Sequence, residues 1–409
     1  MPRLLHTSDW HLGAQLSGLS REEDQRRFLD WLAQQLLDHH VDVLVVAGDI
    51  FDQSLPSADA QRLYYQFLHR VAHSCVRQVV IVGGNHDSAA RLEAPRDLLG
   101  AFQVHVVGGI AHTQDALDRC LLPILGADGE IACVVAAVPY VHEYRLGVRP
   151  VFSPDVDLPA QFRESFTSLY RILADESARR YPGIPLVATG HLACVGGARD
   201  DAPAEIHLIG SIGGLPASIF DDRMQYVALG HLHSGFRVGA SRAWYCGTPV
   251  ALNVKEARSQ RHVLIVDTAA LGDEATVVKV PVPVFRQLLQ LRGPMPQVCA
   301  ALGALRWPED QLAPYVEVVV EVQTHQLGLE QQLADAAPTG VHLMDVIQSF
   351  AGEIPTDRAS PPPSLAALTE EEVFLRLCLA RRETADAALL QAFRSLLAGS
   401  HDGAGQGEP

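Results

Sequence analysis

The chain has 409 residues, a formal net charge of −16 and a hydrophobic fraction of 48%. Its length suffices for a large core and for more than one domain. The acidic charge argues against a generic nucleic-acid coat protein, whose domains are usually basic, but it does not exclude a nuclease, because bound divalent cations supply local positive charge. No segment approaches ~20 uninterrupted apolar residues, so we expect no membrane-spanning helix.

The N-terminal residues run directly into an apolar strand at 4–7 and leave no room for a cleavable signal. We therefore expect a cytoplasmic protein. Seven cysteines are scattered along the chain without a CxxC pair. This pattern argues against a disulfide framework and against a thiolate zinc site.

Residues 1–275 repeat one pattern, in which a short apolar run is followed by a polar motif and then by a helical stretch. The runs are β-branched and end at glycine, as buried strands do; they lie at 4–7, 41–46, 79–82, 186–188 and 226–229. An amphipathic helix is predicted over 21–39. Polar groups at the carboxyl ends of strands in an α/β fold are where ligand sites gather.

Further strands at 104–110 and 131–138 supply enough strands for two sheets packed face to face. We expect a strand pair at 242–247 and 261–267 to close this domain. The sequence therefore predicts a layered α/β fold for residues 1–275.

Five polar motifs follow these strands, and together they predict a two-metal site. They are Asp9-Trp10-His11, Gly48-Asp49-Ile50-Phe51-Asp52, Gly84-Asn85-His86-Asp87, Gly190-His191 and Gly230-His231-Leu232-His233. Two divalent ions a few Å apart need roughly seven or eight oxygen and imidazole ligands around a shared bridge. Taken singly, Asp49 or Asp52 would suit a helix N-cap and a motif histidine would suit a core. Five such motifs in one chain favour the metal site.

Residues 276–356 show a different pattern, without metal-ligand motifs. A strand at 278–284 is followed by a helix, a strand, a helix and a strand; the last four are predicted at 296–305, 315–323, 329–337 and 341–349. This is a small α+β domain.

Residues 357–409 begin with a linker, because the consecutive prolines within 357–364 forbid a helix. A capping box at 369–372 opens the first of two amphipathic helices, which are separated near 381–384. The helices could fold back on the chain's own core, but a helical tail beyond a proline-rich linker favours docking to a partner. We expect residues 401–409 to be disordered.

The motifs resemble those of the calcineurin-like metallophosphoesterase superfamily, all five in order. Within it the chain is similar to the SbcD family of nuclease subunits, through HTSDWHLG (6–13), VVAGDIFD (45–52), VGGNHDS (82–88), VATGHL (187–192), ALGHLH (228–233) and YCGTPV (245–250). The resemblance implies a four-layer α-β-β-α metallophosphoesterase sandwich with a smaller α+β capping domain and a C-terminal helical tail.

The resemblance also implies a role for each motif residue. The first metal is expected on Asp9, His11 and His233, and the second on Asn85, His191 and His231. Asp49 is expected to bridge them, and Mn²⁺ is the implied metal, although Fe²⁺ or Zn²⁺ could occupy the same ligands. His86 is expected to stabilise the phosphate or protonate the leaving oxygen. Asp52 and Asp87 are expected to lie next to these residues and to orient them, without binding a metal themselves.

The implied function is a Mn²⁺-dependent DNA nuclease, a double-strand 3′–5′ exonuclease and a structure-specific single-strand endonuclease that opens hairpins. It would serve DNA repair, replication and recombination with an SbcC-type ATPase bound through the C-terminal helices. A homodimer within a heterotetramer is implied, through helices near 58–73 and 91–101, whose apolar residues could equally pack inside one subunit. Two alternatives stay open: a phosphoesterase of small phosphoesters, and a non-catalytic adaptor of the ATPase.

Overall fold

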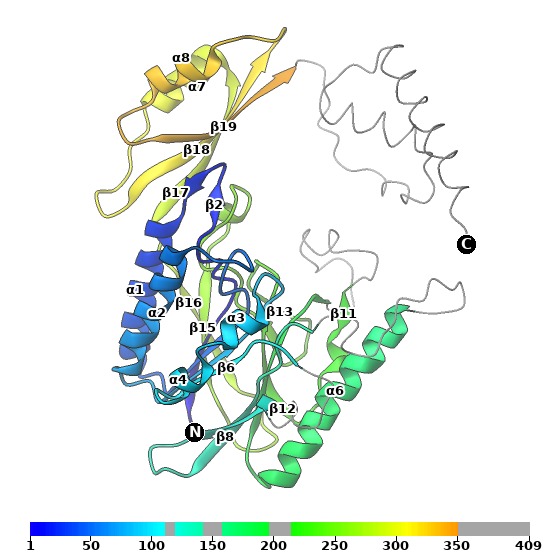
Figure 1. Cartoon of the computed structure of the whole chain (residues 1–409). Helices are drawn as coiled ribbons and strands as arrows, with labels where there is room; N and C mark the ends of the chain where they lie inside the picture. The colour runs from blue at the N-terminus through cyan, green and yellow to red at the C-terminus, as the bar shows by residue number, and fades with distance from the viewer. Residues whose placement is uncertain (111–118, 142–157, 196–213, 351–409) are drawn as a thin grey trace, which may run out of the picture. The chain divides into compact units, whose positions relative to one another are not determined.

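The computed structural model describes residues 1–110, 119–141, 158–195 and 214–350 (Figure 1). The chain divides into two compact units, Met1–Ser349 and Phe350–Pro409. The linker and the helices predicted beyond residue 356 lie outside the described residues. Within the described part of the chain, no helix is long and apolar enough to cross a membrane.

The first sheet has six strands in the order β16-β15-β1-β4-β5-β6. Four of them are mutually parallel: β1 (Arg3–Thr7), β4 (Val43–Ala47), β5 (Gln78–Val82) and β6 (Val104–Val107). The strands β15 (His262–Asp267) and β16 (Thr276–Pro281) extend one edge in antiparallel pairing. Helices α1 (Glu22–Asp38) and α2 (Ala58–Ala72) lie side by side against the outer face, where Phe28, Leu32 and Phe67 pack with Leu44 and Val46 (Figure 1).

The second sheet also has six strands, in the order β13-β14-β12-β9-β8-β7. Their bounds are β7 Leu121–Leu125, β8 Ile131–Ala136, β9 Leu186–His191, β12 Met224–Gly230, β13 Phe236–Arg237 and β14 Ala243–Tyr245. Val45 and Val80 of the first sheet share one buried cluster with Val187 and Tyr226 of the second, so the sheets pack face to face. Helix α6 (Leu158–Arg180) adds Tyr170 and Leu173 to this cluster and covers the outer face. The predicted four-layer α-β-β-α sandwich is confirmed.

The strand pair expected at 242–247 and 261–267 is wrong. Strand β14 pairs with β12 in the second sheet, whereas β15 pairs with β1 in the first. Strand β15 is a short apolar run whose partner β1 lies at the other end of the chain, and a local pattern does not encode such pairing. Short elements lie in the segments between the strands: β2 Gln15–Leu16, β3 Leu19–Ser20, α3 Ala89–Glu93, α4 Arg96–Gly100, β10 Cys194–Val195, β11 Leu215–Pro216 and the 3₁₀ helices η4 Ala217–Ile219 and η5 Glu256–Arg258.

Residues 286–350, here called the cap segment, form a third, three-stranded sheet covered by two helices. Its elements are β17 (Arg286–Pro294), α7 (Met295–Gly303), β18 (Leu312–Val322), α8 (Leu329–Ala336) and β19 (His342–Phe350). The strand expected at 278–284 is β16, which belongs to the first sheet. The cap segment contacts the region before α1, since the Tyr315 hydroxyl donates to the Ser20 carbonyl at 2.9 Å. Domain limits at 275 and 356 stay predictions.

Candidate metal centre

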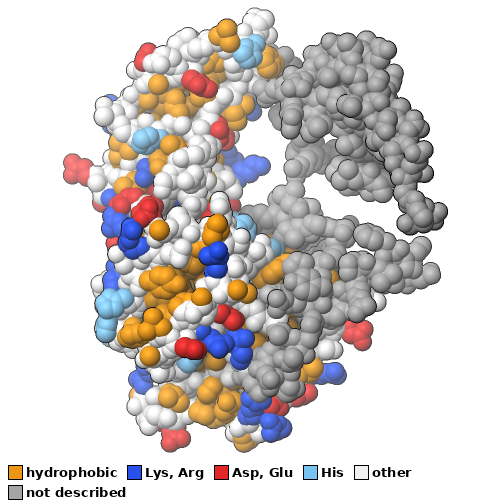
Figure 2. All heavy atoms as spheres, in the orientation of Figure 1, with side chains coloured by type: hydrophobic (Ala, Val, Ile, Leu, Met, Phe, Trp, Pro, Cys, Tyr) orange, Lys and Arg blue, Asp and Glu red, His pale blue; other side chains and the backbone are white. Residues whose placement is uncertain are grey.

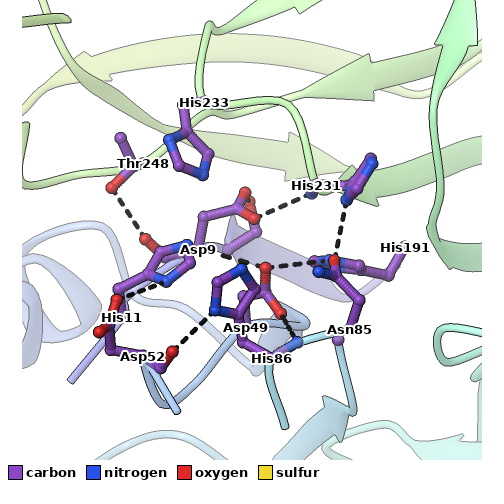
Figure 3. Close-up of polar contacts among 12 residues, drawn as sticks. Asp9, His11, Asp49, Asp52, Asn85, His86, His191, His231, His233 and Thr248 are labelled. Carbon is purple, nitrogen blue, oxygen red and sulfur yellow. Dashed lines mark hydrogen bonds and ion pairs between the residues drawn. The ribbon is translucent and has the colours of Figure 1, made fainter. Parts of the chain in front are cut away.

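The polar motifs meet where the two sheets come together. Asp9, Asp49 and Asn85 follow the carboxyl ends of β1, β4 and β5, which point to one edge because these strands are parallel. His191 is the last residue of β9, and His231 follows β12, so the second sheet supplies these imidazoles. Figure 3 shows the side chains converging on one space.

The backbone at this edge is strained in a consistent way. Asp9, His11, Asp49 and His231 have positive φ angles of 52°, 46°, 49° and 95°, a region that residues with a side chain rarely adopt. Hydrogen bonds hold these turns: Asp9 N donates to Gly48 O at 2.9 Å, and His231 N donates to Asp9 Oδ1 at 2.9 Å. The strain aims the side chains toward the common space.

Two glycines permit the close approach of the loops. A Cβ added at Gly48, where φ is +92°, would lie 2.2 Å from His191 Nδ1. One added at Gly84 would lie 2.1 Å from Asp49 Oδ1. Any larger residue would displace a predicted ligand.

Asp9, His11 and His233, predicted for the first metal, form one cluster. Their potential ligand atoms lie within 4.8 Å of one another, and the rings of His11 and His233 are 5.1 Å apart. Asp9 and His11 are buried, and neither ring nitrogen of His11 has a hydrogen-bond partner among the described residues. A buried imidazole without a partner is costly, and a cation bound at one nitrogen would remove that cost.

The residues predicted for the second metal form an adjoining cluster around Asp49. The Asp49 Oδ2 atom lies 3.2 Å from His191 Nε2 and 3.7 Å from His11 Nε2, so this carboxylate stands between the two clusters. Asn85 Oδ1 lies 3.1 Å from His191 Nε2 and 2.9 Å from His231 Nδ1. These positions match the predicted bridging role of Asp49.

The chemistry of these groups suits bound cations. His191 faces three acceptor oxygens, since its Nδ1 atom is 2.8 Å from Ala47 O and its Nε2 atom faces Asp49 and Asn85. Burial lowers the pKa of His191, but the Asp49 and Asp9 carboxylates and the Ala47 carbonyl together raise it to about 9. Burial raises the pKa of Asp49, but the charge and hydrogen bond of His191 contribute to lowering it below its ordinary value. A divalent cation can take the place of the proton that these acceptors attract.

His86 and Asp52 lie at the open side of the centre. The His86 backbone N–H donates to Asp49 Oδ1 at 2.9 Å, and the exposed ring places Nδ1 2.7 Å from Asp52 O. Because a carbonyl only accepts, Nδ1 is the donor there and Nε2 stays available. The Asp52 carboxylate lies 3.4 Å from His11 Nδ1, on the ring of a predicted ligand.

Asp87 joins two of the motif loops. Its carboxylate accepts the backbone N–H groups of Ile50 at 3.1 Å, Phe51 at 3.0 Å and Gly84 at 2.9 Å. It therefore fixes the loop that carries Asp49 to the loop that carries Asn85. The ring of His86 bonds to Asp52 O instead.

The structure adds two supporting residues that the sequence prediction did not include. Glu256 on η5 places Oε1 3.1 Å from His233 Nδ1, which leaves His233 Nε2 free for a metal. Burial lowers the pKa of His233, but the hydrogen bond to Glu256 and the carboxylates of Glu256, Asp9 and Asp49 together raise it to about 9. The Thr248 hydroxyl donates to Asp9 O at 2.8 Å. Thr248 lies in the YCGTPV segment that carried the resemblance, whereas no motif marked Glu256.

Comparison with known proteins identifies the family of the chain. The calcineurin-like phosphoesterase family matches residues 2–235, and the type 5 capsule protein repressor C-terminal domain matches residues 284–382. The SbcD subunit of the nuclease SbcCD from Rhodobacter capsulatus is 34% identical over 91% of this chain and 93% of its own length. The proteins of the same name from Escherichia coli K12 and Bacillus subtilis are 30% and 31% identical, over 91% and 85% of this chain and 92% and 86% of their own lengths. The chain belongs to the calcineurin-like phosphoesterase family and, within it, to the SbcD subunits of SbcCD nucleases.

Proposed function

We propose that this chain is the metal-dependent DNA nuclease subunit of an SbcCD-type complex and that it hydrolyses phosphodiesters at the metal centre. One observation carries the proposal: two adjoining clusters of potential ligands share the Asp49 carboxylate between them. The relatives are named as nuclease subunits, and the phosphoesterase family covers the residues that build the centre.

The ligands of the two metals are assigned as the sequence predicted. Asp9, His11 and His233 would hold one cation, Asn85, His191 and His231 would hold the other, and the Asp49 carboxylate lies where it could serve both. We assign Mn²⁺, because a mixed set of carboxylate, amide and imidazole ligands suits it. Bound cations would supply Lewis-acid chemistry, lowering the pKa of a water and offsetting charge on the phosphodiester.

His86 is the residue of this chain that we assign to proton transfer. Its Nδ1–H is used by Asp52 O, so the imidazolium form presents its second proton on Nε2. That proton can stabilise a phosphate oxygen or pass to the leaving oxygen. Asp52 and Asp87 position the ring and the loops and transfer no proton.

The finer activities follow from the resemblance. We assign a double-strand 3′–5′ exonuclease and a single-strand endonuclease that opens hairpins, in a cytoplasmic complex for DNA repair, replication and recombination. The ATPase partner is of the SbcC type and binds the helices beyond residue 369, which lie outside the described residues. A domain match extending to residue 382 supports a specialised C-terminal region.

We assign the homodimer contact to the surface around α2, α3 and α4, through the apolar side chains that remain exposed there. Leu63, Tyr64 and Phe67 are 5% exposed or less and pack inside the subunit. Tyr65, Leu98 and Phe102 are 38%, 66% and 47% exposed, and Figure 2 shows hydrophobic side chains gathered over this region. Leu98→Glu should shift the chain toward monomer in sedimentation velocity, and an unchanged dimer would contradict this assignment.

The test of the function is digestion of duplex DNA with Mn²⁺ by the wild type, His86→Ala and Asp49→Ala, with and without the ATPase partner. His325→Ala is the matched control, because this exposed histidine lies in the cap segment. DNA degradation that is lost in both site variants and kept in the control supports the nuclease.

Two other outcomes would replace the proposal. Hydrolysis of bis-p-nitrophenyl phosphate without any DNA cleavage would indicate an enzyme for small phosphoesters. Stimulation of the ATPase without hydrolysis of either substrate would indicate an adaptor.

A further inference from the structure

A cavity of about 380 Å³ lies between the residues that precede β17, the start of α1 and the loop that carries η5. Its charged lining consists of four arginines and one carboxylate: Arg21, Arg258, Arg261, Arg286 and Asp24. The whole chain carries a formal charge of −16. The lining of this cavity is positively charged, in contrast to the acidic chain as a whole. The predicted metal ligands do not line it.

Arg21 is the most deeply buried of these arginines, with 2% of its surface exposed. Its Nη2 atom lies 3.2 Å from Asp24 Oδ1, but Nε and Nη1 have no hydrogen-bond partner among the described residues. A buried guanidinium with unused donors is costly unless something accepts from it. The cavity beside Arg21 is where an acceptor could sit.

Asp24 is already shared between two arginines. It accepts from Arg286 Nε at 3.0 Å while it pairs with Arg21, and the Arg286 guanidinium lies 4.0 Å from the ring centroid of Tyr315. The side chain of Asp24 is 1% exposed and that of Arg286 is 8% exposed. One carboxylate thus faces two buried guanidinium groups, which leaves one positive charge without a counterion within this group.

We propose that the cavity binds a phosphate-type oxyanion through Arg21, Arg286 and, at its rim, Arg258. A tetrahedral dianion accepts several N–H bonds at once, and the planar guanidinium fork matches it. The exposed Arg258 donates one side-chain hydrogen bond, from Nη2 to Gln290 Oε1 at 3.2 Å. The anion would come from a free phosphate compound or from the backbone of a nucleic acid.

The fourth arginine, Arg261, lines the cavity and contacts residues of the predicted metal centre, but it is not itself a predicted metal ligand. Arg261 Nη1 donates to His233 O at 2.6 Å, and Nη2 donates to Glu256 O. Both acceptors belong to residues that build or support the predicted first metal site. The oxyanion site is nevertheless a separate one, and its occupancy does not depend on phosphodiester hydrolysis.

The first experiment titrates sodium sulfate into the full-length, Mn²⁺-loaded chain by calorimetry, with sodium chloride at equal ionic strength as the blank. Arg258→Gln, which removes a rim charge, should weaken sulfate binding at least about tenfold. Arg306→Gln is the matched control at an exposed arginine that donates to carbonyls of its own turn, and it should bind like the wild type. Sulfate held by the metals would bind all of these proteins equally.

A second pair of variants guards against misfolding. Arg21→Gln should abolish the binding, but it alters a buried group. Ser259→Glu leaves every arginine in place and puts a carboxylate at the exposed rim, so it should also abolish the binding in a chain with a wild-type melting temperature. Sulfate affinity equal to wild type in both Arg258→Gln and Ser259→Glu would overturn the proposal.

A DNA-binding experiment distinguishes a free anion from a backbone phosphate. DNA binding by variants that also carry His86→Ala is measured by fluorescence anisotropy at several salt concentrations. If a backbone phosphate occupies the cavity, Arg258→Gln should reduce the slope of log affinity against log salt by about one. If the ligand is a free anion, the slope should not change while sulfate binding is lost. Each result supports the oxyanion site and identifies its ligand.

Discussion

Replacing Glu256 by glutamine should weaken one of two metal-binding steps. The carboxylate accepts three hydrogen bonds: Oε1 faces His233 Nδ1 at 3.1 Å and Asn253 Nδ2 at 2.6 Å, and Oε2 accepts from Leu252 N at 2.8 Å. All three partners are donors. A glutamine must turn its NH₂ group toward at least one of them, whichever way its amide is oriented.

The size of the effect follows from the role of His233. With Nδ1–H held by a carboxylate, the ring keeps the tautomer that offers Nε2 to a metal and stays more basic. Loss of such a partner costs about 10–100-fold in metal affinity, or about 1.4–2.7 kcal/mol. The affected site should be the one formed by Asp9, His11 and His233, because Glu256 bonds directly to one of its ligands.

The assay is calorimetric titration of Mn²⁺ into the chelator-treated chain. Glu274→Gln is the matched control, since Glu274 is exposed and pairs with Arg237 at 2.6 Å. The expected trace shows one step weakened and one unchanged in Glu256→Gln, and two unchanged steps in the control. Equal affinities for both steps in Glu256→Gln and wild type would refute the positioning role.

Three further outcomes follow from the structure. Burial lowers the pKa of His6 to about 3. The neutral His6 ring therefore stabilises the fold fully above pH 6.5, and this stabilisation is lost as the pH falls toward 3. In urea titrations, the free energy of unfolding should fall between pH 7 and pH 4.5 in both proteins, by about 2.5 kcal/mol less in His6→Gln than in the wild type. Gly48→Ala should eliminate high-affinity Mn²⁺ binding in calorimetry, because the new Cβ would lie 2.2 Å from His191 Nδ1, and unaltered binding would contradict the close approach. Chelation should lower the melting temperature, since Asp9 and Asp49 then face each other without cations, and free metal at a hundredfold excess over Kd accounts for about 2.7 kcal/mol; an unchanged melting temperature would count against metal binding by the folded state.

The parts of the fold that sequence reasoning predicted are those set by local pattern. The helix expected over 21–39 is α1 (Glu22–Asp38), and the cap helices expected at 296–305 and 329–337 are Met295–Gly303 and Leu329–Ala336. Their apolar spacing and the β-branched strand runs are visible in a short window. The five motifs are visible for the same reason, since each lies at the end of a strand run and four of them begin with a glycine.

The parts that escaped depend on distant contacts. Glu256 lies 23 residues beyond His233 on a short 3₁₀ helix, and nothing in its neighbourhood distinguishes it from a surface glutamate. The apolar run of strand β15 does not identify its partner, which is β1 at the other end of the chain. Leu63 and Leu98 are apolar residues of the two helices expected near 58–73 and 91–101, and only packing decides that one is 5% and the other 66% exposed.

Because the predicted metal ligands come from both sheets, metal binding should depend on how the two sheets are aligned. Asp9, Asp49 and Asn85 move with the first sheet, whereas His191 and His231 move with the second. A relative slip of about 0.5 Å between the layers would already exceed the tolerance of a metal-ligand constellation. Substitutions in the apolar layer between the sheets, far from any predicted ligand, should therefore weaken metal binding before they unfold the protein.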